Sequence, residues 1–241
     1  MKLLDWEDAP DGYSVAFTTR LGGVSKGDFE SLNLGILTDD DPERVVENRR
    51  RVCAAVGADA ETATMAWQVH GGVVTEARPR GILERTTFDQ CDGLWTETPG
   101  QAMALVTADC HPVAIARKTD GGRGLCVLHV GWRGLLEGIV ESGAAALRPG
   151  SLRAIVGPGI GPCCYEVGEE VSQPFRERFG DTVVVDGNLD LAAATEQALR
   201  EAGVTAVERT GHCTACEPEL FFSHRRDRGR TGRQGVIAYI G

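Results

Sequence analysis

The sequence has no apolar run approaching the roughly 20 residues that a membrane-spanning helix needs. Its first eleven residues include four acidic ones, where an export signal would need an apolar stretch. Basic residues are in the minority, because 25 Lys and Arg stand against 35 Asp and Glu, a formal net charge of −10. This balance argues against a protein that binds the phosphate backbone of nucleic acids. We therefore expect a cytoplasmic protein with neither a membrane nor a nucleic-acid partner.

The sequence also lacks internal repeats and low-complexity linkers. We therefore expect a single catalytic domain over residues 1–241. The eight cysteines are unevenly spaced, and without an export signal we expect reduced thiols rather than a disulfide framework. Each cysteine then has to be explained by packing, metal binding or nucleophilic chemistry.

Helix and strand signals are mixed along the chain. Asp41 as N-cap, Pro42 in the first turn and Gly57 at the stop predict a helix between them. Further helices are expected after GWRGLLEG up to about Leu147, and in GEEVSQPFRERFG and LDLAAATEQALREAG. Strand-like segments are SVAFTTR, TMAWQVHG, GVVTEA, CDGLWTE, QAMALVTADC, PVAIARK, GLCVLHVG, LRAIVG and VIAYI. Because a regular strand–helix–strand alternation is missing, the pattern favours an α+β (mixed α/β) fold over a doubly wound sheet.

Three candidate metal ligands stand at the ends of apolar strands. His70 ends AWQVHG, Cys110 ends ALVTADC, and His129 comes near the end of GLCVLHVG. Strand ends on a rigid sheet can direct side chains into one cleft. Two imidazoles and a thiolate suit zinc, and three protein ligands leave the fourth tetrahedral position open, as in catalytic zinc sites. Without a metal, the same residues could form a cysteine nucleophile with a histidine base.

Four other cysteines give weaker signals. Cys213 and Cys216 form a CxxC motif with histidines on both sides, but a structural zinc needs four ligands and a thioredoxin-like pair needs a surrounding strand–helix unit. Cys163 and Cys164 are adjacent, so we expect their side chains to diverge rather than to chelate one ion. We therefore expect all four to be structural or to lie near the substrate.

Two glycine-containing segments are candidates for the substrate site. GPGIGPCCYEVG demands unusual backbone angles, either as a tight turn into the following helix or as a wall of the substrate site. GWRG places Arg133 directly after a ligand-bearing strand at an expected helix N-terminus, where backbone N–H groups favour anions. An arginine there can clamp a phosphate or carboxylate, or simply form a surface salt bridge.

Together these motifs resemble a known bacterial family, the laccase-like polyphenol oxidases, also called peptidoglycan editing factors and purine nucleoside phosphorylases. The resemblance is carried by FTTRLGGVSKGDFESLNLG, DDPERVVENRR, AWQVHGGVV, VTADCHPV, LHVGWRGLLEGIV, VGPGIGPCCYEVGEEV, GHCTACEPELFFSHRRD and TGR. It covers almost the whole chain in order. It implies a four-layer α/β/β/α sandwich of mixed sheets flanked by helices.

The resemblance further implies a metal ion bound by His70, Cys110 and His129, described in the family as zinc and sometimes as copper. The implied activities are phosphorolysis of adenosine, inosine, guanosine and methylthioadenosine, with phosphate as the second substrate, and deamination of adenosine. His111 stands where the family usually has Leu, and being adjacent to Cys110 it is expected to point away. Substrate contacts are expected from residues within the matching motifs: Arg20, Asn48, Arg49, Gln68 and Arg133.

The activities attributed to this family conflict, so we compare what each activity requires with the residues that this chain has. Efficient laccases couple several copper ions through many histidines, whereas this chain has five histidines in all. We therefore predict a zinc-dependent purine nucleoside phosphorylase with adenosine deaminase activity. Because no HxE signature is present, deamination would have to use Asp109 or Glu166 as acid/base. A copper-dependent laccase-like polyphenol oxidase stays open as an alternative, as does a hydrolase that edits peptidoglycan precursors.

Overall fold

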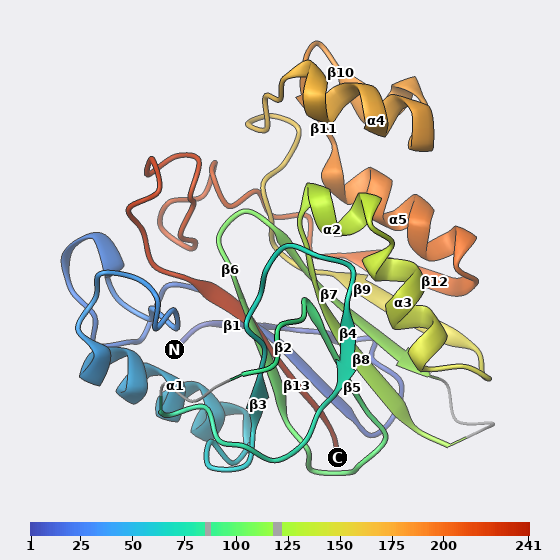
Figure 1. Ribbon diagram of the computed structural model, residues 1–241. Coiled ribbons are helices and arrows are strands. Elements are labelled where there is room, and N and C mark those ends of the chain that lie inside the picture. Colours follow the sequence, from blue (N-terminus) through green and yellow to red (C-terminus); the bar gives the residue numbers. More distant parts are fainter. Residues whose placement is uncertain (85–87, 118–121) are drawn as a thin grey trace.

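The computed structural model describes residues 1–84, 88–117 and 122–241, and it contains two large mixed sheets (Figure 1). The five-stranded sheet has the order β1 (Leu3–Asp5), β2 (Tyr13–Thr18), β13 (Gln234–Ile240), β6 (Met103–Thr107), β3 (Thr64–Met65). The six-stranded sheet has the order β12 (Val204–Arg209), β9 (Leu152–Val156), β7 (His111–Arg117), β8 (Gly124–Val130), β5 (Gly93–Thr96), β4 (Val74–Glu76). A short hairpin pairs β10 (Val184–Val185) with β11 (Asn188–Leu189).

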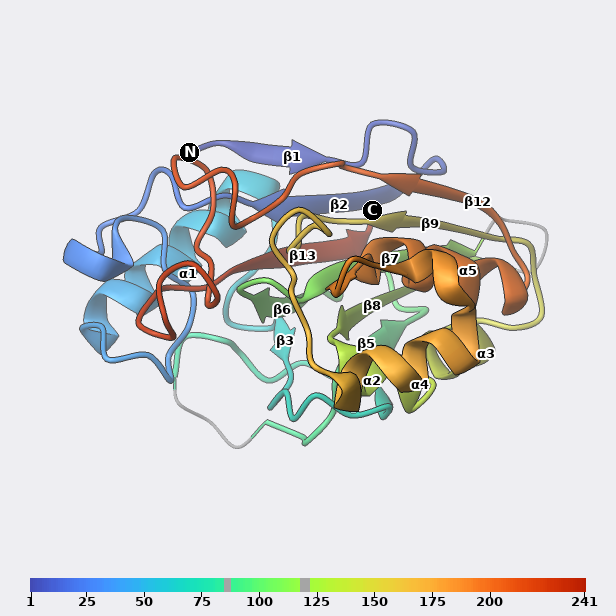
Figure 2. The same ribbon diagram turned by 90° about the horizontal axis from the view of Figure 1, so that it is seen from above.

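Five α-helices flank these sheets within the described part of the chain. They are α1 (Pro42–Val56), α2 (Trp132–Leu136), α3 (Ile139–Ala146), α4 (Glu169–Phe179) and α5 (Leu191–Glu201), with 3₁₀ turns at Gly27–Phe29 and Asp181–Val183. Helix α1 lies beside the five-stranded sheet, while α2 to α5 gather on the opposite side of the molecule, over the six-stranded sheet (Figures 1 and 2). The expected α/β/β/α sandwich is therefore confirmed.

Side-chain alternation along the strands explains the layers. In β8, Leu125 and Val127 belong to the apolar core between the two sheets, whereas Cys126 and Leu128 belong to the core beneath α3, α4 and α5. Successive side chains of a strand point to opposite faces, so one strand serves both cores. This is why β7 and β8 are buried along their whole length and appear in the sequence as continuous apolar runs.

Local signals place the helices where the sequence predicts them. The Asp41 side chain accepts a hydrogen bond from Glu43 N at the start of α1, Pro42 occupies its first turn, and Gly57 closes it with a φ of 76°. Helix α5 is capped in the same way by Asp190, which accepts from Ala193 N. None of the described helices is long and apolar enough to cross a bilayer.

Two strand predictions differ from the structure. The strand expected at TMAWQVHG ends at Met65, because the following backbone N–H groups of Val69, His70 and Gly71 donate to the Asp92 carboxylate instead of to a neighbouring strand. Strand β12 was not expected, and it forms by parallel pairing with β9 at the sheet edge. Lys118, the last residue of the expected PVAIARK strand, lies outside the described residues.

Candidate metal centre and pocket

The three predicted ligands come from different elements that meet at one end of the layer between the sheets. His129 follows Leu125 and Val127 on the face of β8 that points toward the five-stranded sheet. Cys110 lies in the connection between β6 and β7, where the chain passes from one sheet to the other. His70 lies in the irregular segment after β3. The topology thus brings together ligands that are far apart in the sequence.

The ligand atoms of His70, Cys110 and His129 all lie within 4.8 Å of one another. The two imidazole rings meet edge to face, with centroids 4.7 Å apart and planes at 73°. Gly131 leaves the space that this convergence needs, since a Cβ there would lie 3.0 Å from Cys110 Sγ and 3.3 Å from His70 Cδ2. The glycine of the GWRG motif is therefore required by the close approach of β8 to the other two ligands.

Asp92 orients two of these ligands from a fully buried position. Its Oδ1 lies 2.7 Å from His129 Nδ1 and accepts a hydrogen bond from His70 N at 2.9 Å, while Oδ2 accepts from Gly71 N at 2.8 Å. Burial alone would raise the pKa of Asp92, but the hydrogen bonds from His129 and the backbone hold that pKa below its ordinary value. The bond to Nδ1 leaves His129 Nε2 available as a ligand atom, an arrangement common at metal-bound histidines.

The electrostatics of Cys110 favour its thiolate form. Burial alone would raise the pKa of the thiol, but the charges and hydrogen bonds of His129 and His70 lower it to about 6. The opposite applies to His129, where burial would lower the pKa but the Cys110 thiolate and Asp92 raise it to about 9. Cys110 can therefore serve as an anionic ligand, or as a nucleophile, near neutral pH.

Two residues beside the centre adopt backbone angles that are unusual for side-chain-bearing residues. His70 has a φ of 64° and Asp109 a φ of 88°. The surroundings hold Asp109 in place, since its carboxylate accepts from Thr214 Oγ1 and from Arg225 N, both at 2.7 Å. Such local strain is commonly found at functional sites.

The donor set fits a single metal ion. A tetrahedral zinc ion with nitrogen and sulfur ligands at about 2.0–2.3 Å keeps its ligand atoms roughly 3.3–3.8 Å apart. The ligand atoms of the three residues lie within 4.8 Å of one another, which is compatible with this spacing. The thiolate, the two histidines and the Asp92 carboxylate behind one of them are all present. The residues His70, Cys110 and His129 can therefore hold a metal ion with an open fourth position.

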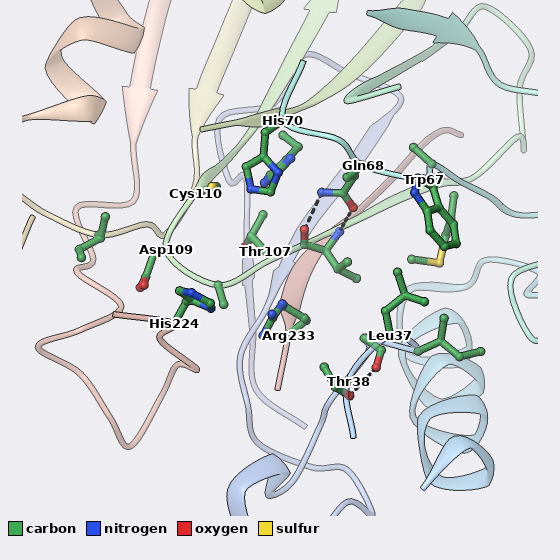
Figure 3. Close-up of a pocket in the computed structure, with 18 of the residues that line it drawn as sticks. Leu37, Thr38, Trp67, Gln68, His70, Thr107, Asp109, Cys110, His224 and Arg233 are labelled. Carbon is green, nitrogen blue, oxygen red and sulfur yellow. Dashed lines mark hydrogen bonds between the residues drawn. The ribbon is translucent and has the colours of Figure 1, made fainter. Parts of the chain in front are cut away.

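The three ligands border a cavity of about 550 Å³ (Figure 3). Its lining includes the apolar side chains of Leu37, Met65, Trp67 and Phe88. Polar side chains also line it: Thr38, Gln68, Thr107, Asp109, His224, Arg225 and Arg233. The volume lies within the range usual for small-molecule sites.

Only some of the expected substrate residues line this cavity. Gln68 does, and its amide is held by Val106, accepting from Val106 N at 2.9 Å and donating to Val106 O at 2.7 Å (Figure 3). Arg49 does too, but it is buried and donates to the carbonyl oxygens of Leu34 and Ile82.

The other three expected residues are not among the lining residues. Asn48 is fully buried, and its side chain bonds Val24 N, Ser25 Oγ and the carbonyls of Ser31 and Asn33. Arg20 donates to the carbonyls of Glu30 and Pro218. Arg133 is exposed, with its guanidinium over the Trp132 ring.

The remaining sequence predictions near the site are also resolved by the structure. Ile160 and Tyr165 line the cavity, so GPGIGPCCYEVG is a wall of it. His111 is directed away from the metal centre, with Nδ1 3.0 Å from Gly157 O. Of the two acid/base candidates, Asp109 lines the cavity and Glu166 is exposed outside its lining.

The prediction that the side chains of adjacent Cys163 and Cys164 diverge is wrong. The sulfur atoms of Cys163, Cys164, Cys213 and Cys216 all lie within 4.8 Å of one another. Residues 162–164 form a turn rather than an extended strand, so the two side chains do not point to opposite faces.

Sequence reasoning missed three residues at the site: Asp92, His224 and Arg233. Asp92 could have been found as an aspartate at the start of the apolar segment CDGLW, where a buried carboxylate needs partners. Arg233 belongs to TGR and His224 to SHRRD, but nothing local in either motif shows that it reaches the cavity.

The fold and site define a mixed-sheet sandwich protein with a candidate mononuclear metal centre. The family model described as "Multi-copper polyphenol oxidoreductase laccase" matches residues 14–241, so the chain belongs to this family.

The chain is also similar to proteins that are named as enzymes. A protein of Deinococcus radiodurans named purine nucleoside phosphorylase is 41% identical over 239 residues, covering 92% of this chain and 87% of the relative. Purine nucleoside phosphorylase YlmD of Geobacillus stearothermophilus is 37% identical over 251 residues, covering 95% and 90%. The crystal structure of the Bacillus licheniformis hypothetical protein YfiH superposes with a TM-score of 0.89 at 32% identity, covering 98% of this chain and 99% of the other.

Proposed function

We propose that this protein is a purine nucleoside phosphorylase that uses a zinc ion held by His70, Cys110 and His129. The observation that carries the proposal is the convergence of these three donors on a cavity of about 550 Å³. The names of relatives that match nearly the whole chain support the same activity. The cavity is large enough for a nucleoside together with a phosphate ion.

The cavity lining offers both apolar and polar contacts for a nucleoside. Trp67 and Phe88 offer aromatic faces, and Leu37 and Met65 offer apolar contacts, to which a flat purine base can pack. Gln68 presents an amide beside the ligands, and we retain it with Arg49 as a substrate contact. The other three expected substrate residues do not line the cavity, so they would have to influence substrate binding indirectly: Arg20, Asn48 and Arg133.

Arg233 is the best placed residue for the phosphate. Its Nη1 donates to the carbonyls of Thr231 and Gly232 at 2.9 Å, which holds the side chain at the cavity (Figure 3). Burial lowers the pKa of Arg233, while the nearby charges of Asp109 and Cys110 oppose this effect. A half-buried guanidinium whose charge is only partly balanced can attract an anion and clamp it through two N–H groups.

In phosphorolysis, an oxygen of hydrogen phosphate bonds to the ribose C1′ while the bond from C1′ to the purine nitrogen breaks, and the leaving base gains the proton that the phosphate loses. Arg233 would neutralise and orient the phosphate, and Trp67 and Phe88 would hold the base for departure. Asp92 would keep His129 in the orientation that ligation needs. The zinc ion, when bound, supplies a Lewis acid that polarises an oxygen of the substrate or of water.

The test is release of hypoxanthine from inosine by purified protein, with and without inorganic phosphate. We expect phosphate-dependent release. Cys110→Ala should lower kcat/KM by about 100-fold or more, the scale of losing a key electrostatic group. Arg233→Gln should mainly raise the KM for phosphate. Arg51→Gln, which breaks a surface ion pair with Glu47, is the matched control and should change neither parameter.

Hypoxanthine release that does not need phosphate, or that survives Cys110→Ala, would contradict this assignment. Adenosine deamination is part of the same proposal, and it predicts conversion of adenosine to inosine without phosphate. Asp109 lines the cavity, but both of its oxygens already accept hydrogen bonds, so we expect deamination to be slower than phosphorolysis.

Two other activities predict different results. Phenol oxidation would require copper loading and oxygen uptake, but only His70 and His129 of the five histidines share a ligand cluster, which is too few for a multi-copper centre. A hydrolase of peptidoglycan precursors would use the Cys110 thiolate as nucleophile, keep its activity after chelation, and form a trappable acyl-enzyme.

A further inference from the structure

Four cysteines outside the candidate metal centre form a cluster on two loops. Cys163 and Cys164 come from the loop between β9 and α4, and Cys213 and Cys216 from the loop after β12. Cys163 Sγ lies 3.3 Å from Cys216 Sγ and 3.5 Å from Cys213 Sγ, and Cys164 Sγ lies 3.4 Å from Cys216 Sγ. All four sulfur atoms lie within 4.8 Å of one another.

This spacing is that of a metal tetrathiolate. Zn–S bonds of about 2.3 Å in a tetrahedron place sulfur atoms roughly 3.8 Å apart. A disulfide requires about 2.05 Å and joins the sulfur atoms in exclusive pairs. Here the three closest sulfur–sulfur distances are 3.3–3.5 Å, and Cys163 and Cys216 each lie close to two partners, so all four cysteines are free thiols. Four cysteine thiolates form a soft ligand set, which selects zinc over hard cations.

The backbone around the cluster is arranged as in a ligand site. Gly161 N donates a hydrogen bond to Cys213 Sγ at 3.2 Å, the kind of contact that stabilises a thiolate ligand. A Cβ at Gly161 would lie 3.3 Å from Cys163 Sγ, so glycine lets this loop close over the sulfur atoms. Cys213 also forms an isolated parallel bridge with Gly159, which fixes one loop against the other.

We propose that Cys163, Cys164, Cys213 and Cys216 bind one structural zinc ion, separate from the centre at His70, Cys110 and His129. Four protein ligands fill the tetrahedron, so this ion has no open position for substrate. It joins two loops that both contribute to the wall of the cavity, the first through Ile160 and Tyr165 and the second through His224 and Arg225. The ion therefore stabilises the two loops that form this wall of the cavity.

The test uses the full chain with Cys110→Ala, purified without added metal, so that the first centre is disabled. We expect one zinc ion per chain by native mass spectrometry, with four sulfur neighbours at about 2.3 Å by zinc X-ray absorption. Adding Cys213→Ser and Cys216→Ser should reduce the zinc content from one ion to none. Adding Cys53→Ala, which removes a buried cysteine outside both clusters, should leave it at one.

The X-ray absorption measurement decides the question even if the double serine variant fails to fold. A Cys110→Ala protein without zinc, or with nitrogen or oxygen ligands around it, would overturn the proposal. So would a wild-type chain showing fewer than eight reactive thiols after unfolding in chelator, since that would reveal disulfides. These outcomes are independent of the phosphorylase assay, so either proposal can fail without the other.

Discussion

At the scale of single residues, Asp92 shows how a buried carboxylate can set the properties of the candidate metal centre. It touches one ligand side chain and the backbone of a second, and it accepts four side-chain or backbone N–H groups. Asp92→Asn replaces one acceptor oxygen with an NH₂ group that faces N–H donors. Loss of the charge also removes one of the factors that raise the pKa of His129.

We expect Asp92→Asn to weaken zinc binding at the first centre by about 10–100-fold, as for other groups that orient a metal-bound histidine. Competition with a chromophoric chelator, on a background lacking Cys213 and Cys216, measures this affinity. Asp89→Asn is the control, because Asp89 lies three residues before Asp92 in the sequence and forms an exposed ion pair with Arg80. Equal zinc affinity in the wild type and Asp92→Asn would show that Asp92 has no role in ligation.

The contrast between the ligands and the substrate residues shows what the sequence can predict at this scale. His70, Cys110 and His129 stand out because polar residues interrupt apolar segments within motifs that cover the whole chain. Asn48 is equally polar and also lies within a matching motif, yet its side chain donates to the carbonyls of Ser31 and Asn33 and not into the cavity. Whether a polar side chain serves the fold or the substrate depends on partners distant in sequence, which no local pattern specifies.

At the scale of one element, the loop of residues 223–231 is held closed by Asp227. Its carboxylate accepts from Arg226 Nε and Nη2 at 2.8 Å and from Thr231 Oγ1 at 2.9 Å. Burial would raise the pKa of Asp227, but these hydrogen bonds and the charge of Arg226 lower it. The pKa of Asp227 is thus lower in the folded chain than in the unfolded chain, where it is about 3.9. The ionised carboxylate therefore stabilises the fold fully at pH values above the unfolded-state pKa. This stabilisation is lost as the pH falls through the folded-state pKa.

Asp227→Asn should therefore lower the free energy of unfolding at pH 7 by about 1–2 kcal/mol, the scale of a lost charge-assisted hydrogen bond. The difference from the wild type should shrink as pH falls below about 4. Urea unfolding across this range measures both effects. Asp28→Asn breaks the exposed Arg230–Asp28 pair of the same loop and should cost less than about 0.5 kcal/mol. Equal losses in the two variants, or a difference that is independent of pH, would contradict this account.

At the scale of the whole molecule, local patterns predicted the elements better than their pairing. The capping residues of α1 and the apolar runs of β7 and β8 are visible in the sequence. The position of β13 between β2 and β6 is not, because it joins the end of the chain to segments more than 100 residues away. Strand β12 was missed because an edge strand is only partly buried and its apolar pattern is weak. Strand pairing depends on how the two sheets share a core. A short stretch of sequence does not carry this information.

The core between the two sheets should make the chain unfold as one unit, as expected for a single domain. Val127 on β8 is fully buried in this core, together with Phe17 and Leu105 from the other sheet. Val127→Ala should lower the free energy of unfolding by about 2–3 kcal/mol, from lost burial and the cavity left behind.

Val185→Ala makes the same chemical change at a position that is 60% exposed, and it should cost less than about 0.5 kcal/mol. Tryptophan fluorescence and far-UV circular dichroism during urea unfolding should give one coincident transition for each protein, shifted to lower urea only in Val127→Ala. Two separated transitions, with only one of them shifted by Val127→Ala, would show that the sheets unfold independently and that the chain is not a single domain. Coincident transitions are expected because β8 contributes side chains to the inter-sheet core and to the core under the helices, so neither can be lost while the other stays intact.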